Sequence, residues 1–203
     1  MKSNTMIKVW DPLVRVFHWS LVVAFFTAYF TEDDFLTLHT YAGYTVLGLI
    51  LFRILWGLVG SRHARFSDFV TSPRTAWQYL KDTLRFRAKR YLGHNPAGGA
   101  MIVMLLLSLL ITTLTGIAVY GAAESAGPLA AWLGNIGERG EDVLKEIHEF
   151  FANFTLLLVA IHVSGVIVES FIHRENLVKS MVNGNKAQMP KVSNKIQSDK
   201  SSI

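Results

Sequence analysis

Four of the seven histidines in the 203-residue chain fall inside or at the ends of long apolar stretches. They are His18, His39, His148 and His162. A polar ring is costly in a lipid bilayer, so an intramembrane histidine indicates a functional group, unless it is merely buried and hydrogen-bonded. The chain has no cysteine, which excludes disulfides, iron–sulfur clusters and thioether-linked haem. Any haem in this chain must therefore be held without thioether bonds.

The spacing of these histidines predicts two pairs at two depths. His148 and His162 are 14 residues apart, which is about 21 Å along a helix with an angular offset of about 40°. One face of the last helix therefore carries both rings. If helix directions alternate, His39 enters its helix from the same side as His148. His18 and His162 then lie at similar distances from the opposite side, so each pair can face across the bundle.

Paired neutral imidazoles at two depths suit two non-covalent b-type haems, each bound by two axial nitrogens. A bare divalent metal held by two imidazoles would lack ligands and neutralising charge, both of which a porphyrin supplies. The alternative for each of the four is a buried histidine that binds no metal. The other three histidines fall in connections or at helix ends, and we expect them to be ordinary interfacial residues: His63, His94 and His173.

Arg53 is the one formal charge well inside its apolar stretch. It follows His39 by 14 residues, so it shares that helix face at the depth of the inner histidine pair. We expect it to contact a haem propionate. The alternative is a side chain that extends to the cytoplasmic headgroups.

The composition predicts a membrane protein, with 51% hydrophobic and only 17% charged residues against about 25% charged in soluble domains. The apolar stretches predict an all-α integral membrane four-helix bundle within residues 1–184, with spans at about 12–31, 36–59, 96–121 and 147–171. Between the second and third spans, apolar residues recur near helical spacing, which favours an interfacial helix over a solvated basic loop. They are Trp77, Leu80, Leu84 and Tyr91. The polar segment 185–203 is predicted to be a disordered cytoplasmic tail.

The distribution of charge predicts the orientation. Seventeen of the 20 Lys and Arg residues fall at the termini or in the second connection, and only Arg139 and Lys145 lie in the other connections. The positive-inside rule then places both termini in the cytoplasm. Because the charges lie between apolar stretches, nucleic acid is not an expected partner.

Several short motifs occur in a set order: Val9-Trp10-Asp11-Pro12, Arg15-x-x-His18-Trp19, His39-x-x-x-Gly43, Arg53-x-x-Trp56-Gly57, Gly93-His94-Asn95-Pro96, His148-Glu149, His162-x-x-Gly165 and His173-x-Glu175-Asn176. Together they resemble the bacterial cytochrome b561 and nickel-iron hydrogenase cytochrome b family. The resemblance implies a di-haem b bundle in the bacterial inner membrane, with the four intramembrane histidines as ligands.

The function expected from this resemblance is electron transfer between the quinone pool and a redox partner. That partner would be a periplasmic c-type cytochrome or a hydrogenase-like enzyme, and a quinone or quinol would be the membrane substrate. Whether the chain counts as a quinol oxidoreductase subunit or only as an electron carrier stays open. The alternatives are a cation transporter that uses its histidines and a membrane-anchor subunit of a redox enzyme.

Overall fold

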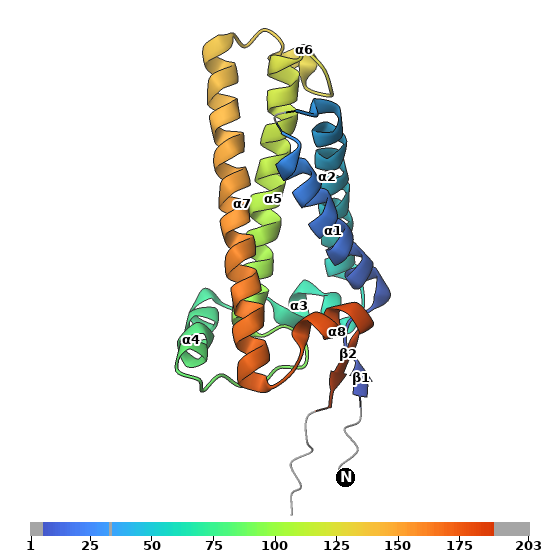
Figure 1. Cartoon of the computed structure of the whole chain (residues 1–203), viewed down its shortest axis with the longest axis vertical. Coiled ribbons are helices and arrows are strands. Elements are labelled where there is room, and N and C mark those ends of the chain that lie inside the picture. Colours follow the sequence, from blue (N-terminus) through green and yellow to red (C-terminus); the bar gives the residue numbers. More distant parts are fainter. Residues whose placement is uncertain (1–5, 33, 189–203) are drawn as a thin grey trace, which may run out of the picture.

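Four long helices dominate the computed structural model, which describes residues 6–32 and 34–188 (Figure 1). The elements in chain order are β1 (Met6–Lys8), α1 (Pro12–Phe30), α2 (Leu36–Val59), the 3-10 helix η1 (Arg62–Ala64), α3 (Phe66–Phe69), α4 (Pro73–Leu84), α5 (Pro96–Ala123), α6 (Ala130–Leu133), α7 (Glu138–His173), α8 (Leu177–Asn183) and β2 (Asn185–Ala187). Helices α1, α2, α5 and α7 are long and apolar enough to cross a membrane. The predicted all-α, four-span membrane bundle is therefore confirmed.

Helix α7 begins earlier than the apolar pattern indicates. It has 36 residues, or about 54 Å at the usual rise, whereas the predicted span begins near residue 147. Residues 138–146 are mostly charged, so a hydrophobicity criterion misses them although they continue the same helix. The first turns of α7 lie at the upper end of the bundle, the end that also holds α6 (Figure 1).

Three helices begin at a polar residue followed by proline. The side chains of Asp11, Ser72 and Asn95 accept hydrogen bonds from the backbone N–H groups of Val14, Thr75 and Gly98. The proline that follows each cap needs no hydrogen bond for its nitrogen and already has a helical φ. These local signals fix where α1, α4 and α5 start.

Asp11 also joins the inner ends of α1 and α2. Its Oδ2 accepts hydrogen bonds from Trp56 Nε1 at 3.2 Å and from Ser61 Oγ. Burial acts to raise the pKa of this carboxyl, but hydrogen bonds from Ser61, Val14 and Trp56 outweigh burial and lower it. The ionised carboxylate is therefore the form that holds the two helices together.

The bundle contains two closely packed helix pairs, α5 with α7 and α1 with α2. A buried apolar cluster that includes Phe25, Ile50 and Leu109 connects α1, α2 and α5. Between α5 and α7, Ser108 Oγ and Thr155 Oγ1 form a buried hydrogen bond of 2.7 Å. Many large apolar side chains remain exposed along all four helices, as expected for surfaces that face lipid.

The predicted interfacial helix of the second connection is present as α4, which packs against α5. Its apolar residues Trp77, Leu80 and Leu84 are exposed, whereas Tyr79 and Thr83 are buried against the bundle. One side of α4 therefore packs against the bundle, and its exposed apolar side is available to contact the membrane interface.

The two termini pair with each other, which corrects part of the predicted disordered tail. Strand β2 runs antiparallel to β1, with Ile7 opposite Lys186. Lys186 is buried and lies 3.5 Å from the carboxylate of Glu175. The order of residues 185–187 depends on a strand far away in sequence, which local composition cannot show. The rest of the predicted tail, 189–203, lies outside the described residues.

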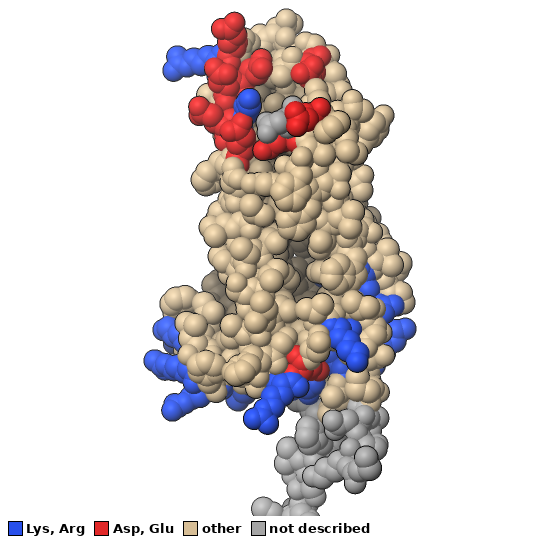
Figure 2. Space-filling view, viewed as in Figure 1, with Lys and Arg blue, Asp and Glu red and all other residues tan. Residues whose placement is uncertain are grey.

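Charge separates to the two ends of the molecule (Figure 2). Acidic side chains gather at the upper end, around the start of α7, and Lys and Arg gather at the lower end. The positive-inside rule predicts that the lower end faces the cytoplasm.

Reporter fusions test this orientation. A reporter that is active only in the periplasm should work at Asp34 and at Arg139, because their connections are acidic. The same reporter at Arg85 should be inactive, while a cytoplasmic reporter at Arg85 should work. A cytoplasmic signal at Arg139 would contradict the topology and the depth pairing of the histidines.

Candidate cofactor sites in the bundle

The outer histidine pair comes together between α2 and α7. The ring centroids of His39 and His148 are 6.0 Å apart and the rings are nearly perpendicular, at 83°. His39 Nδ1 lies 2.8 Å from the backbone oxygen of Ala28, and His148 Nδ1 lies 2.9 Å from that of Thr112. A carbonyl oxygen only accepts, so each Nδ1 carries the proton and donates it. Both Nε2 atoms are left with a free lone pair, as a metal ligand requires.

The distance between these rings fits an iron atom held between them. A metal–imidazole bond is about 2 Å long, so two such bonds and two half-rings span about 6 Å. Gly116 is needed on the α5 side, since a Cβ there would lie 2.8 Å from His148 Cε1. A Cβ at Gly43, one turn after His39, would meet no atom within 4 Å. The residues around this pair therefore leave room for a macrocycle.

The inner pair lies on α1 and α7. His18 and His162 are within electrostatic range of each other, and the Nδ1 atom of His18 is buried with no hydrogen-bond partner. Over the described residues, α7 packs more closely against α5 than against α1 or α2. The rings of His39 and His148 lie close together, and the assignment of the four histidines as ligands stays a prediction.

The Arg53 side chain is buried within the protein. Its residue surface is 3% exposed, and its guanidinium carbon lies 5.0 Å from the centre of the Phe66 ring and 5.8 Å from that of Phe69. Its Nη1 atom is buried without a hydrogen-bond partner. Among the described residues no carboxylate lies within 4.0 Å of it. A buried cation without a counter-charge is costly, so this position favours an anionic ligand.

Sequence analysis did not predict the packing of His94. Its ring lies between the rings of Trp10 and Phe69, at centroid distances of 4.5 and 4.7 Å. Burial lowers the pKa of His94 to about 3, and the nearby charges of Arg53 and Lys186 act in the same direction. The ring is therefore neutral, and its Nδ1 atom is buried without a partner.

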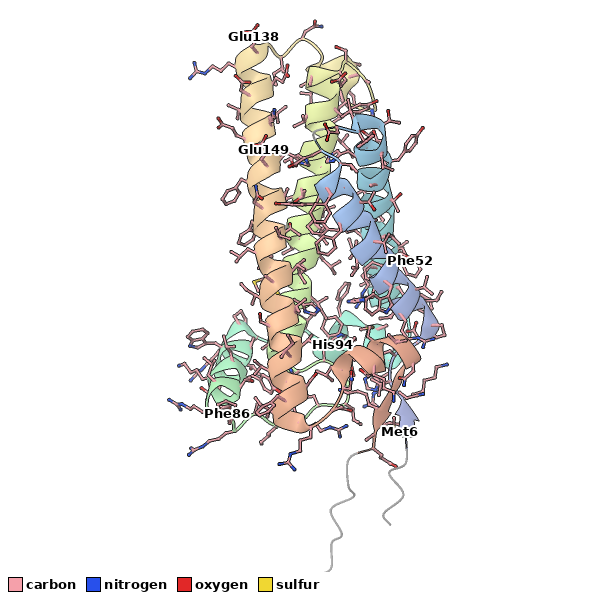
Figure 3. The ribbon with its side chains drawn as sticks, viewed as in Figure 1. Met6, Phe52, Phe86, His94, Glu138 and Glu149 are labelled. Carbon is pink, nitrogen blue, oxygen red and sulfur yellow. The ribbon has the colours of Figure 1, made fainter. Side chains whose placement is uncertain are left out.

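His94 as a residue is half-buried. Figure 3 places it at the lower end of the bundle, the end away from Glu138. The expectation of an interfacial histidine did not include the packing of this ring between Trp10 and Phe69, which come from segments distant in sequence. The available signal was the Gly-His-Asn-Pro motif that precedes α5.

The remaining two histidines each lie close to a carboxylate. His63 Nδ1 lies 2.9 Å from Asp68 Oδ2, and His173 Nε2 lies 3.0 Å from Glu169 Oε2. In the part of the chain that the structure describes, no three His, Cys, Asp or Glu side chains are grouped to hold a metal ion. The intramembrane nitrogen donors therefore occur as pairs.

Comparisons with known proteins all identify b-type cytochromes. Residues 9–184 match the family described as prokaryotic cytochrome b561. A probable Ni/Fe-hydrogenase B-type cytochrome subunit of Azotobacter vinelandii is 28% identical, with 91% of this chain and 90% of the relative covered. The protein of the same name from Cupriavidus necator is 30% identical, covering 90% and 88%.

The probable Ni/Fe-hydrogenase 1 B-type cytochrome subunit of Escherichia coli K12 is 27% identical, with 97% of this chain and 99% of the relative covered. No solved structure is matched by the chain.

The histidine pairing predicts which substitutions act on the same haem. His39→Ala and His148→Ala should each remove one haem or convert it to high spin, because each removes one axial nitrogen from the outer site. His18→Ala and His162→Ala should do the same to the other haem. Optical and electron paramagnetic resonance spectra of the four variants measure this. A common haem disturbed by both His39→Ala and His162→Ala would refute the pairing.

Proposed function

The chain belongs to the prokaryotic cytochrome b561 family, and on that premise we propose that it carries electrons through two haems b between the quinone pool and a partner on the outer side. As a membrane b-type cytochrome it binds haem b. The proposal adds that the chain holds two haems, that four histidines are their ligands, and that a quinone is the membrane substrate. In it, His39 and His148 bind the outer haem, and His18 and His162 bind the inner one.

The geometry of the outer pair is the observation that carries this proposal. Two rings from different helices stand 6.0 Å apart, and each donates its Nδ1 proton to a backbone carbonyl. These hydrogen bonds fix the tautomer and the ring orientation, and they make each Nε2 a stronger ligand.

When bound, haem supplies the one-electron chemistry, and the residues of this chain fix its position and its electrostatic surroundings. The 14-residue step from His148 to His162 sets the two sites about 21 Å apart along α7. This separation is about two thirds of the thickness of a bilayer core, which is about 30 Å.

Arg53 and His94 are proposed to hold the propionates of the inner haem. Both have a buried nitrogen without a partner, and the two side chains are within electrostatic range of each other. A guanidinium donates to carboxylates in pairs of hydrogen bonds, and a neutral imidazole N–H adds one more. A propionate there would satisfy these donors and neutralise Arg53.

The acidic end of α7 is the proposed docking side for the redox partner. Its first turns carry Glu138, Glu141, Asp142 and Glu146. Acidic side chains gather at the upper end of the bundle (Figure 2), where Figure 3 labels Glu138. The names of the curated relatives favour a hydrogenase as that partner, and a c-type cytochrome is the other candidate. In this proposal the chain lies in the bacterial inner membrane with both termini in the cytoplasm.

Quinol-driven reduction tests the function directly. Purified protein in proteoliposomes should show reduced b-type absorbance bands after addition of a benzoquinol or a naphthoquinol, and the matching quinone should reoxidise them. The electron-transfer proposal would fail if dithionite reduced the haem but neither quinol did so. A protein without haem bands would instead favour the transporter or anchor alternatives.

A further inference from the structure

Helix α4 is held at the basic end of the molecule, which is the end where Lys and Arg gather (Figure 2). Tyr79 donates its hydroxyl proton to Glu169 Oε2 at 3.2 Å, and Thr83 donates to Oε1 at 3.1 Å. Glu169 lies in the last turns of α7, two residues before Phe171, which is 77% exposed. An exposed aromatic residue near the end of a membrane-spanning helix faces lipid or the membrane interface. Helix α4, at the lower left of Figure 1, therefore lies at the level where the lipid-facing surface of α7 ends.

Three apolar side chains form a stripe along the exposed side of α4. Trp77, Leu80 and Leu84 are all exposed, Leu84 to 71%, and they lie within an arc of about 60° at 100° per residue. We call these three residues the apolar stripe. Phe86, just after the helix, is exposed as well. The described part of the chain leaves the apolar stripe uncovered, so it needs an apolar neighbour.

Three basic residues form a second stripe next to the first. Arg74, Lys81 and Arg85 are exposed, lie within an arc of about 40° and extend over about 16 Å of helix. We call these three residues the basic stripe. Lys81 Nζ lies 5.4 Å from the centre of the Trp77 ring, so the two stripes are in contact.

The basic stripe has no counter-charge close to it. Among the described residues no carboxylate lies within 4.0 Å of its three side chains. Asp82 is the one carboxylate in the sequence of α4, and it accepts a hydrogen bond from Gln78 Nε2 at 3.1 Å. Asp82 lies on the side of the basic stripe away from the apolar stripe. The three cations are therefore available to an anionic ligand.

We propose that α4 binds the headgroups of anionic phospholipids in the leaflet at the basic end of the molecule. The lipid phosphates contact the basic stripe, and the acyl chains cover the apolar stripe. A lipid with a net negative charge suits both stripes, whereas a zwitterionic lipid brings a cation of its own to the basic stripe. The site is independent of the haem assignments, because it uses none of the intramembrane histidines and not Arg53.

Two other anionic ligands match only part of this surface. Inorganic phosphate would contact the basic stripe and leave the apolar stripe in water. An acidic soluble protein would reach the basic stripe from the aqueous side, but the apolar stripe lies at the level of Phe171, where the neighbour is lipid. Basic residues beside an apolar face are typical of helices that lie in the membrane interface.

The charge of the headgroup should decide the affinity. Each Lys or Arg near an anionic membrane surface strengthens binding roughly fivefold, and salt weakens this contribution. Three cations together therefore predict a clear preference for an anionic over a zwitterionic lipid, and this preference should be larger at low salt.

Native mass spectrometry of the purified full-length protein with its haem, in a non-ionic detergent, measures lipid binding directly. Dioleoyl phosphatidylglycerol should bind more tightly than dioleoyl phosphatidylcholine. Arg85→Gln should weaken the binding of phosphatidylglycerol roughly fivefold, because it removes one cation. The triple variant Arg74→Gln, Lys81→Gln and Arg85→Gln should bring the affinity for phosphatidylglycerol close to that for phosphatidylcholine.

A matched control removes the same charge from other elements at the same end. Lys8 on β1, Arg62 on η1 and Lys179 on α8 are exposed, and the variant Lys8→Gln, Arg62→Gln and Lys179→Gln should keep the preference for phosphatidylglycerol. Leu84→Gln leaves every cation in place and should weaken the binding of both lipids. Inorganic phosphate should displace phosphatidylglycerol no more than sodium chloride does at the same ionic strength.

Equal affinities of the two lipids in the parent protein would overturn the inference and favour an acidic protein as the ligand of the basic stripe. An equal loss in the triple variant and its control would also overturn it, because the effect of charge would then be diffuse. Specific displacement by inorganic phosphate would do the same. If the triple variant does not fold, Arg85→Gln decides the test, since an unchanged affinity for phosphatidylglycerol there contradicts the site. Unchanged haem content in the variants would leave the proposed function standing if this inference fails.

Discussion

A histidine ring within a bilayer must satisfy two nitrogen atoms without help from water, and the arrangement of this bundle follows from that constraint. One nitrogen of each outer ring donates to a backbone carbonyl, Ala28 for His39 and Thr112 for His148. Ala28 lies in the last turn of α1, and its carbonyl oxygen accepts from the backbone N–H of Thr31 as well as from His39. The last turn of α1 thus supplies the acceptor that orients His39. The second nitrogen of each ring remains for a metal.

The same constraint explains why the polar residues of α7 lie along one face of this helix. Seven-residue steps repeat a position on one helix face with a small angular drift, and α7 uses four such positions for His148, Thr155, His162 and Glu169. Thr155 is fully buried and binds Ser108 of α5. A polar packing contact therefore lies between the two histidines and fixes α7 against α5, while α7 packs less closely against α1 and α2.

Sequence analysis predicted the spans and the histidine positions because both depend on local periodicity. Helix caps at Asp11 and Asn95 and the 14-residue step on α7 are visible in the sequence alone. The burial of His94 was not predictable in this way, because it depends on Trp10 and Phe69, which come from other parts of the chain. The pairing of β1 with β2 has the same origin. The early start of α7 was missed for a different reason, since a hydrophobicity criterion finds the membrane boundary and not the end of the helix.

The central claim is that each chain holds two haems b, each between two neutral imidazoles. A reduced-minus-oxidised spectrum of the purified protein, with haem quantified as its pyridine complex against protein concentration, measures this most directly. The account predicts b-type bands and two haems per chain, both low spin when oxidised. One haem per chain, or haem with only one nitrogen ligand, would contradict it.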